Sequence, residues 1–312
     1  MDILCVGLVV SDILVKPVRR NIFENDTNYV DYVHYKLGGD AFNVASGVKK
    51  AGLDVALAGA VGKDASGEKI KDATCKLGIK DCISEKSDVA TATSIVLIEE
   101  NGERHFAYYP GSNRMLNKDD VLYLLDQNPK MLHISGVLAL ENLDKELKLI
   151  FQEAKKRGIT TSMDVTNDID NKWFEKISDA MEYVDIFIPS LTEAQKLSGD
   201  TNLEGIVSFF DNFQFESFVV KLGEEGCFVK TKDEQFTLAP IPVGEVCDTT
   251  GAGDNFVAGF LAARLKGLDI YDSAVVASVS ASFCISKIGA EPGFKDWDEL
   301  FKISEKHLRR KI

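Results

Sequence analysis

The sequence predicts an α/β fold: a doubly wound, mostly parallel sheet flanked by helices, with a small second β-sheet. From residue 119 onward, apolar strand-like runs alternate with helical segments, and helices of this length between strands are typical of a parallel sheet. Residues 13–36 do not continue as a strand-to-helix unit, which indicates the second sheet. With 312 residues and 45% hydrophobic content, the chain can bury the core of one large domain or of two smaller ones.

The first predicted strand is the apolar run over 3–10, which we expect to be buried on both faces. Ser11 and Asp12 follow at its carboxyl end, where ligands of open α/β sheets bind. Asp12 is therefore either a ligand-binding residue or a turn-forming aspartate.

Three extended segments predict the second sheet. Residues 13–36 alternate in character and are rich in aromatic and β-branched residues near 29–35. Strands over 93–98 and 104–109 are joined by Glu99-Glu100-Asn101-Gly102, which is typical of a hairpin turn. We expect these segments, about 13–36 and 92–110, to pair with one another.

The other elements follow in chain order. Gly38 and Gly39 open a predicted helix over 38–47, with Asp40 near its start. A strand over 55–60 comes next, and residues 61–67 lead into a helix that runs to about residue 77. Beyond residue 119, we expect helices at 119–126, 143–156 and 173–181, and strands at 133–139, 160–165 and 185–188.

The C-terminal part begins with a strand, a glycine turn and a strand over 218–229. A strand-like run over 241–247 precedes an apolar helix over 256–265. Residues 274–284 are rich in small side chains and should pack closely, and an amphipathic helix over 297–308 closes the fold.

Between the strand-like run and the helix, residues 248–254 read DTTGAGD. We expect free backbone N–H groups of Gly251, Ala252 and Gly253 at the helix start, where the helix dipole favours a phosphate. This predicts an anion hole. Asp254 is either an N-cap or the group that accepts a proton from an attacking hydroxyl, and since a helix N-terminus lowers a carboxyl pKa, we expect it to be ionised.

Composition restricts the function classes. The net charge of −13 argues against binding to nucleic acids or anionic membranes. Six cysteines without a C-x-x-C pair favour a reducing compartment, so we expect a cytoplasmic protein. The sequence has neither a signal-peptide pattern nor an apolar run long enough to cross a membrane.

Two motifs resemble the signatures of the ribokinase-like (PfkB) carbohydrate kinases. DTTGAGDNF resembles the second signature, D-T-x-G-A-G-D-x-F, and GGDAFNVA over 38–45 resembles the first, G-G-x-x-x-N-x-A. No Walker-type phosphate loop occurs in the chain. The resemblance covers essentially the whole chain. It implies a ribokinase-like fold in one kinase domain over 1–312, whose second sheet is a lid over the sugar.

The resemblance also implies roles for individual residues. Asp254 would be the catalytic base, and Gly251, Ala252 and Gly253 would stabilise the transferring phosphoryl group. The residues that would hold the acceptor sugar are Asp12, Gly38, Gly39, Asp40, Asn43 and, with weaker similarity, Asn113. Asp40 stands where family members vary most. Two carboxylates, Asp12 and Asp40, in one pocket would disfavour anionic acceptors, although Asp40 could instead be the helix N-cap.

The resemblance also implies which residues bind the nucleotide and its metal ion. PSLTE over 189–193 resembles P-N-x-x-E, in which Glu193 would organise the water around nucleotide-bound Mg²⁺, but Ser190 replaces the usual Asn. VKLGEEG over 220–226 resembles V-x-L-G-x-x-G and assigns Lys221, Gly223 and Gly226 to ATP. Asp248 and Thr250 match a monovalent-cation site, which makes K⁺ activation an expectation. Asp164 and Asn167 resemble a further D-x-N motif that would face the nucleotide, and the alternative is that they form a turn.

The function we predict is ATP-dependent phosphorylation of a hydroxyl on a small neutral sugar or polyol, with a possible homodimer through the lid. Two alternatives are open. A nucleoside kinase of the same superfamily would stack the base on Tyr108 or Tyr109. A protein that binds ATP and sugar without turnover would be a sensor; Asp254 argues against it, whereas Ser190 leaves room for it.

Overall fold

The main sheet has nine strands in this computed structural model, which describes residues 1–100 and 103–309. Seven neighbouring strands are parallel, and β14 and β15 add an antiparallel edge, so the predicted doubly wound sheet is confirmed. The strand order is β15 (Gln235–Leu238), β14 (Cys227–Lys230), β13 (Ser217–Lys221), β12 (Ile186–Phe187), β11 (Thr160–Val165), β10 (Met131–Val137), β1 (Ile3–Gly7), β4 (Val55–Ala58) and β6 (Lys80–Asp81).

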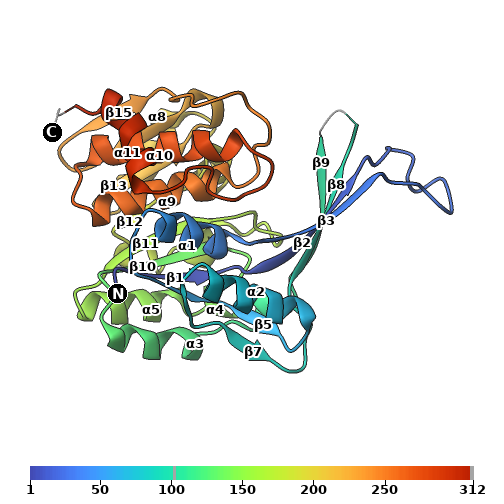
Figure 1. The fold of residues 1–312 in the computed structure, drawn as a ribbon. Coiled ribbons are helices and arrows are strands. Elements are labelled where there is room, and N and C mark those ends of the chain that lie inside the picture. Colours follow the sequence, from blue (N-terminus) through green and yellow to red (C-terminus); the bar gives the residue numbers. More distant parts are fainter. Residues whose placement is uncertain (101–102, 310–312) are drawn as a thin grey trace.

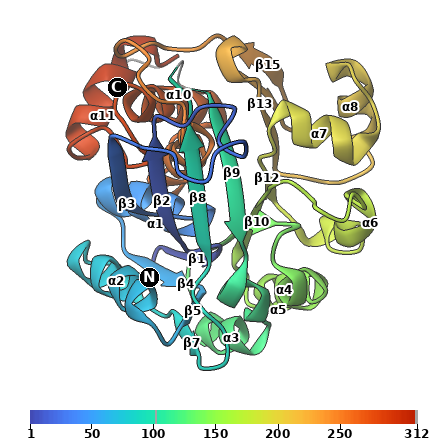
Figure 2. The same ribbon diagram turned by 90° about the vertical axis from the view of Figure 1, so that its right-hand side faces the viewer.

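Helices cover both faces of this sheet, so there are two buried cores (Figures 1 and 2). Alternate side chains of β1 point to opposite faces of the sheet. Leu4 and Val6 lie in the first core, and Ile3 and Cys5 lie in the second. The first core is covered by α3 (Asp119–Leu122), α4 (Glu141–Asp144), α5 (Leu147–Lys156), α6 (Phe174–Ile177), α7 (Leu191–Ser198) and α8 (Leu203–Phe210). The second is covered by α1 (Asp40–Lys50), α2 (Ala65–Lys76), α9 (Ala252–Leu265), α10 (Ile270–Ile285) and α11 (Trp297–Ser304).

A four-stranded sheet, which we call the lid sheet, projects from one side of the main body (Figure 1). Its order is β3 (Tyr32–Gly38), β2 (Val10–Lys16), β8 (Thr93–Ile98) and β9 (Arg104–Tyr109). A two-stranded sheet pairs β5 (Ala60–Gly62) with β7 (Ser84–Lys86). The predicted turn residues Asn101 and Gly102 lie outside the described residues.

The predicted first strand over 3–10 is wrong in one respect, because the chain leaves the main sheet after Gly7 and enters the lid sheet at Val10. Asp12 therefore lies inside β2 and does not follow a strand. The break is fixed by Asn113, whose amide accepts from Val9 N (3.4 Å) and donates to Val9 O (3.1 Å). These bonds pair Val9 with a side chain in place of a neighbouring strand.

Residues 241–247, predicted as strand-like, form no strand. Their backbone groups pair with α10 and its end: Ile241 N donates to Ser278 Oγ (3.0 Å), and Cys247 N donates to Ile285 O (2.8 Å). The predicted helices over 119–126, 143–156 and 173–181 are shorter or divided, as the bounds of α3 to α6 show. Within the described ranges, every helix is too short or too polar to cross a membrane.

Candidate active site

The start of α9 is shaped by a left-handed residue. Gly251 is its N-cap with φ of 73°, and a Cβ at this position would lie 2.4 Å from Ala290 Cβ, so only glycine fits. In the described part of the chain, the N–H groups of Gly251 and Gly253 have no hydrogen-bond partner. The N–H of Ala252 donates to Thr249 O (3.3 Å), so the prediction of three free N–H groups is wrong for this residue. Two free N–H groups at a helix start can still bind an anion.

Asp254 lies in the first turn of α9 and accepts a 2.7 Å hydrogen bond from Asn43 Nδ2 in α1. Its pKa is raised to about 7, mainly by burial and also by the charge of Asp164, against the opposing effects of Asn43 and Lys221. The expectation that the helix N-terminus lowers the pKa of Asp254 is therefore wrong, because the loss of solvent outweighs the helix dipole. A carboxyl with this pKa is better matched to proton transfer near neutral pH.

A cavity of about 300 Å³, which we call the α9 cavity, opens beside Asp254. Three more acidic side chains and one lysine line it: Asp40, Asp164, Glu193 and Lys221. Burial raises the pKa of Asp40 to about 8 and that of Asp164 to about 7, while the ammonium of Lys221 lowers both. The cavity therefore holds four carboxyl groups, including that of Asp254, beside one lysine.

The nucleotide-side residues fall into two groups. Ser190, Lys221 and Gly223 line the α9 cavity together with Glu193, although they come from different loops. Ser190 and Glu193 form a capping box at the start of α7: Glu193 N donates to Ser190 Oγ (3.3 Å) and Ser190 N donates to Glu193 Oε2 (2.6 Å). Gly226 lies outside the cavity and forms the turn before β14, with φ of 90°.

Asp164 and Asn167 are the residues that resemble the D-x-N motif. Asp164 lies within β11 and lines the α9 cavity. Asn167 is exposed and does not line it. Thr166, which the sequence did not single out, lines the cavity in its place.

A second, smaller cavity of about 50 Å³ lies between the lid sheet and the loop that leads to α9. Asp12 lines it, and burial raises the pKa of Asp12 to about 7. A Cβ on Gly38 would lie 2.4 Å from Asp12 Oδ2, so this glycine leaves room for the carboxyl. Asp248 and Thr250 line the same cavity, together with Arg104 from β9.

The structure places Asp12 and Asp40 in different cavities. Asp40 faces Asp254 and Glu193, whose charges raise its pKa. The charges of both carboxyls nevertheless raise the pKa of Tyr108, and their binding of one acceptor stays a prediction. Asp40 is also not an N-cap: Gly39, with φ of 94°, holds that position and Asp40 begins α1.

A third cavity, of about 460 Å³, lies beside Tyr108. The pKa of Tyr108 is raised to about 12, mainly by burial, and the charges of Asp40 and Asp12 also raise it. Tyr108 Oη accepts from Asn113 Nδ2 (3.1 Å). Because Asn113 is fully buried and its amide hydrogens already bond to Tyr108 and Val9, it fixes the lid connection and the Tyr108 ring.

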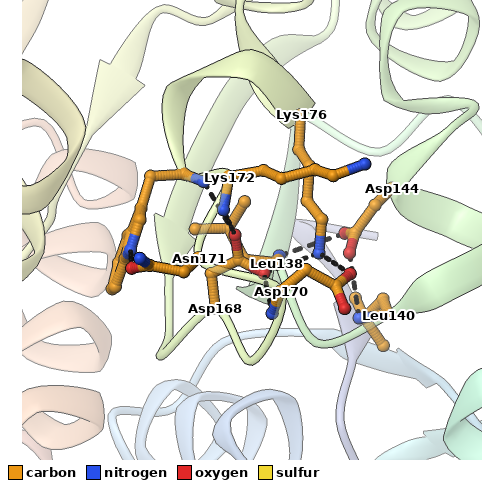
Figure 3. Close-up of polar contacts among 9 residues, drawn as sticks. Leu138, Leu140, Asp144, Asp168, Asp170, Asn171, Lys172 and Lys176 are labelled. Atoms are coloured by element: carbon orange, nitrogen blue, oxygen red, sulfur yellow. Dashed lines mark hydrogen bonds and ion pairs between the residues drawn. The ribbon is translucent and has the colours of Figure 1, made fainter.

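Two buried carboxylates support the wall of this third cavity (Figure 3). Asp144 accepts from the N–H groups of Leu138 and Leu140, each at 3.1 Å. Asp168 accepts from Lys176 Nζ (2.6 Å) and from the backbone N–H of Lys172 (2.6 Å). These contacts hold the loops after β10 and β11 in fixed positions.

The chain is similar to known proteins over nearly its whole length. The model of the pfkB family carbohydrate kinases matches residues 1–297. A nucleoside kinase of Methanocaldococcus jannaschii is 25% identical over 308 residues, which cover 98% of this chain and 97% of the relative.

Two solved structures share the fold. Ribokinase of Arabidopsis thaliana complexed with ribose and ATP has a TM-score of 0.81 at 24% identity, covering 97% of this chain and 98% of that one. A putative ribokinase II from E. coli in complex with ATP and Mg²⁺ has a TM-score of 0.84 at 22% identity, covering 98% and 99%.

Proposed function

Because this chain belongs to the pfkB family of carbohydrate kinases, we propose that it transfers the γ-phosphoryl group of ATP to a hydroxyl of a sugar or polyol. The observation that carries the proposal is Asp254, a half-buried carboxyl with a pKa raised to about 7, next to two free N–H groups at the start of α9. One group accepts a proton and the others bind the moving phosphoryl group.

The reaction follows from these positions. The acceptor hydroxyl gives its proton to Asp254 as its oxygen bonds to the γ-phosphorus, and the bond from phosphorus to the bridging oxygen breaks to release ADP. Gly251 and Gly253 donate their N–H groups to the phosphoryl oxygens, aided by the positive end of α9. Asn43, which donates to Asp254 Oδ2, fixes the direction of the accepting oxygen.

ATP lies in the α9 cavity in this proposal, with Lys221, Gly223 and Ser190 near its phosphates. Two carboxylates fit the Mg²⁺ that accompanies ATP, since Asp164 uses Oδ1 for Gly136 N and Glu193 uses Oε2 for Ser190 N, leaving an oxygen on each for a hard cation. When bound, Mg²⁺ neutralises charge on the phosphate chain.

Asp12, Gly38, Gly39, Asp40 and Asn43 hold the acceptor in this proposal. Since burial raises the pKa of Asp12 and of Asp40, both carboxyls are largely protonated at pH 6 and can donate as well as accept hydrogen bonds. This suits neutral hydroxyls. Protonated carboxyls also repel anions only weakly, so anionic acceptors are included among the compounds to be tested.

The lid sheet would cover the acceptor and exclude water, which limits wasteful hydrolysis of ATP. Exposed aromatic side chains on it, Tyr32, Tyr35, Phe106 and Tyr109, support the further proposal of a homodimer through the lid. Sedimentation velocity tests this: a monomer at micromolar concentration would contradict it.

The direct test is release of ADP from Mg-ATP with a panel of neutral sugars, polyols, sugar acids, sugar phosphates and nucleosides. We expect the highest kcat/KM with a neutral sugar or polyol. A nucleoside preference would favour the second candidate, which the 460 Å³ cavity beside Tyr108 supports. Binding of ATP without turnover of any acceptor would favour a sensor.

The pH profile tests the role of Asp254. With both substrates limiting, we expect kcat/KM to fall about tenfold per pH unit below about 7, because Asp254 must be ionised to accept the proton. Lys221→Met should move this acid limb to higher pH, since the ammonium lowers the pKa of Asp254. Asp164→Asn should move it to lower pH, since the charge of Asp164 raises that pKa. If the acid limb of kcat/KM fell at the same pH in the wild type and in both variants, Asp254 would not be the group that titrates.

A further inference from the structure

The lid sheet makes an ion pair with the loop that leads to α9. Arg104 in β9 places a guanidinium nitrogen 2.6 Å from Asp248 Oδ1, and only 21% and 12% of the two side chains are exposed. The two residues are far apart in the sequence, so the pair exists only when the lid lies against this loop. Its burial distinguishes it from the surface pairs of the lid, such as Arg19 with Glu100, whose side chains are 76% and 65% exposed.

Asp248 organises the anion hole from both sides. Its Oδ1 accepts from Thr250 N (2.8 Å), which fixes the turn before Gly251. Its Oδ2 accepts from Gly289 N (2.9 Å) in the segment next to Ala290, against which Gly251 packs. The position of the free Gly251 N–H therefore depends on Asp248, and the charge of Asp248 is balanced by Arg104.

A monovalent cation does not fit this arrangement. The guanidinium already occupies one side of Asp248, and a second cation there would be repelled. The nearby carbonyl oxygens are also engaged: Thr250 O accepts from Cys284 Sγ (3.3 Å), and Ala290 O accepts from Asn255 Nδ2 (2.9 Å). The sequence-based expectation that Asp248 and Thr250 hold K⁺ therefore disagrees with their observed partners.

We propose that Arg104 is a positioning residue whose guanidinium takes the place of a monovalent cation at Asp248. Arg104 also lines a cavity of about 480 Å³ with Thr249, Thr250 and Gly251, so it lies beside the loop that presents the anion hole. Closure of the lid brings this charge to Asp248 and orders the loop; opening withdraws it and leaves an uncompensated carboxylate near the phosphate. Phosphoryl transfer is thus coupled to lid closure and needs no K⁺. This inference rests on the proposed kinase function.

The first test needs no turnover. In hydrogen–deuterium exchange of the whole protein, Arg104→Ala should speed exchange in peptides from both β9 and residues 285–293, because the pair holds each to the other. Arg19→Ala, which removes an exposed pair of the same lid, should leave residues 285–293 unchanged. Unchanged exchange at 285–293 in Arg104→Ala would overturn the coupling, whether or not the protein turns over any acceptor.

The second test separates a missing charge from a structural defect. The wild type should show equal kcat in KCl and NaCl at equal ionic strength, and Arg104→Ala should lose on the order of 10²-fold in kcat with a smaller change in the KM for ATP. Added guanidinium ion or K⁺ should restore part of the kcat of Arg104→Ala, and Arg104→Lys should retain more activity. Strong activation of the wild type by K⁺, or no rescue of the alanine variant, would overturn the proposal.

Discussion

Asp254→Asn should lower kcat by about 10³-fold while the KM values for ATP and acceptor change little. The amide has the volume of the carboxyl and can still accept the hydrogen bond from Asn43, so the site keeps its shape. It cannot take the proton of the acceptor hydroxyl. Steady-state kinetics at saturating Mg-ATP measure this loss, and a variant with near wild-type kcat would show that another group is the base.

The same variant should be more stable than the wild type at alkaline pH. The pKa of Asp254 is raised to about 7 in the fold, so its contribution to stability is present at low pH and is lost as the pH rises through 7. An amide carries no such pH-dependent cost. Melting curves should show a higher Tm for Asp254→Asn at pH 8.5 and a smaller difference at pH 5. A lower Tm at both pH values would attribute the lost activity to damage of the fold.

The second large effect is expected at the two glycines of the anion hole. A Cβ on Gly253 would meet no atom closer than Lys221 Nζ at 3.6 Å, so Gly253→Ala should fold normally. Its methyl group would project into the α9 cavity where the phosphates are proposed to bind, and we expect kcat/KM for ATP to fall about 10²-fold with an unchanged Tm.

Gly251→Ala is the matched comparison. A left-handed φ of 73° costs an alanine about 1–2 kcal/mol, and the contact of 2.4 Å with Ala290 Cβ adds strain. This variant should therefore lose both Tm and activity. If Gly253→Ala kept full activity while binding ATP normally, phosphates would not approach the start of α9 and the proposed anion hole would be wrong.

Much of the fold could be predicted because local pattern and tertiary structure agree. The alternation of strands and helices after residue 119 gave the parallel sheet, and the glycine pair at 38–39 gave the start of α1. The errors lie where a distant side chain replaces a strand partner. Asn113 divides the first strand by bonding to Val9, and Ser278 in α10 takes the backbone N–H of Ile241.

The candidate site was predictable to the extent that it is local in sequence. DTTGAGD contains the turn, the free N–H groups and Asp254, so the motif alone indicates them. The pKa values and ion pairs of the site depend on residues that are distant in the sequence. The raised pKa of Asp254 depends on burial and on Asp164 from another strand, and the partner of Asp248 comes from the lid. No spacing in the sequence links Arg104 to Asp248.

Phosphoryl transfer to a hydroxyl can be followed directly by ³¹P NMR of the wild-type protein with Mg-ATP and the best acceptor of the panel. We expect the γ-phosphate signal to disappear as equal amounts of ADP and a new phosphomonoester appear, and we expect Asp254→Asn to give neither at a comparable rate. ADP with only inorganic phosphate, or a phosphomonoester formed equally fast by Asp254→Asn, would contradict phosphoryl transfer to a hydroxyl with Asp254 as the base.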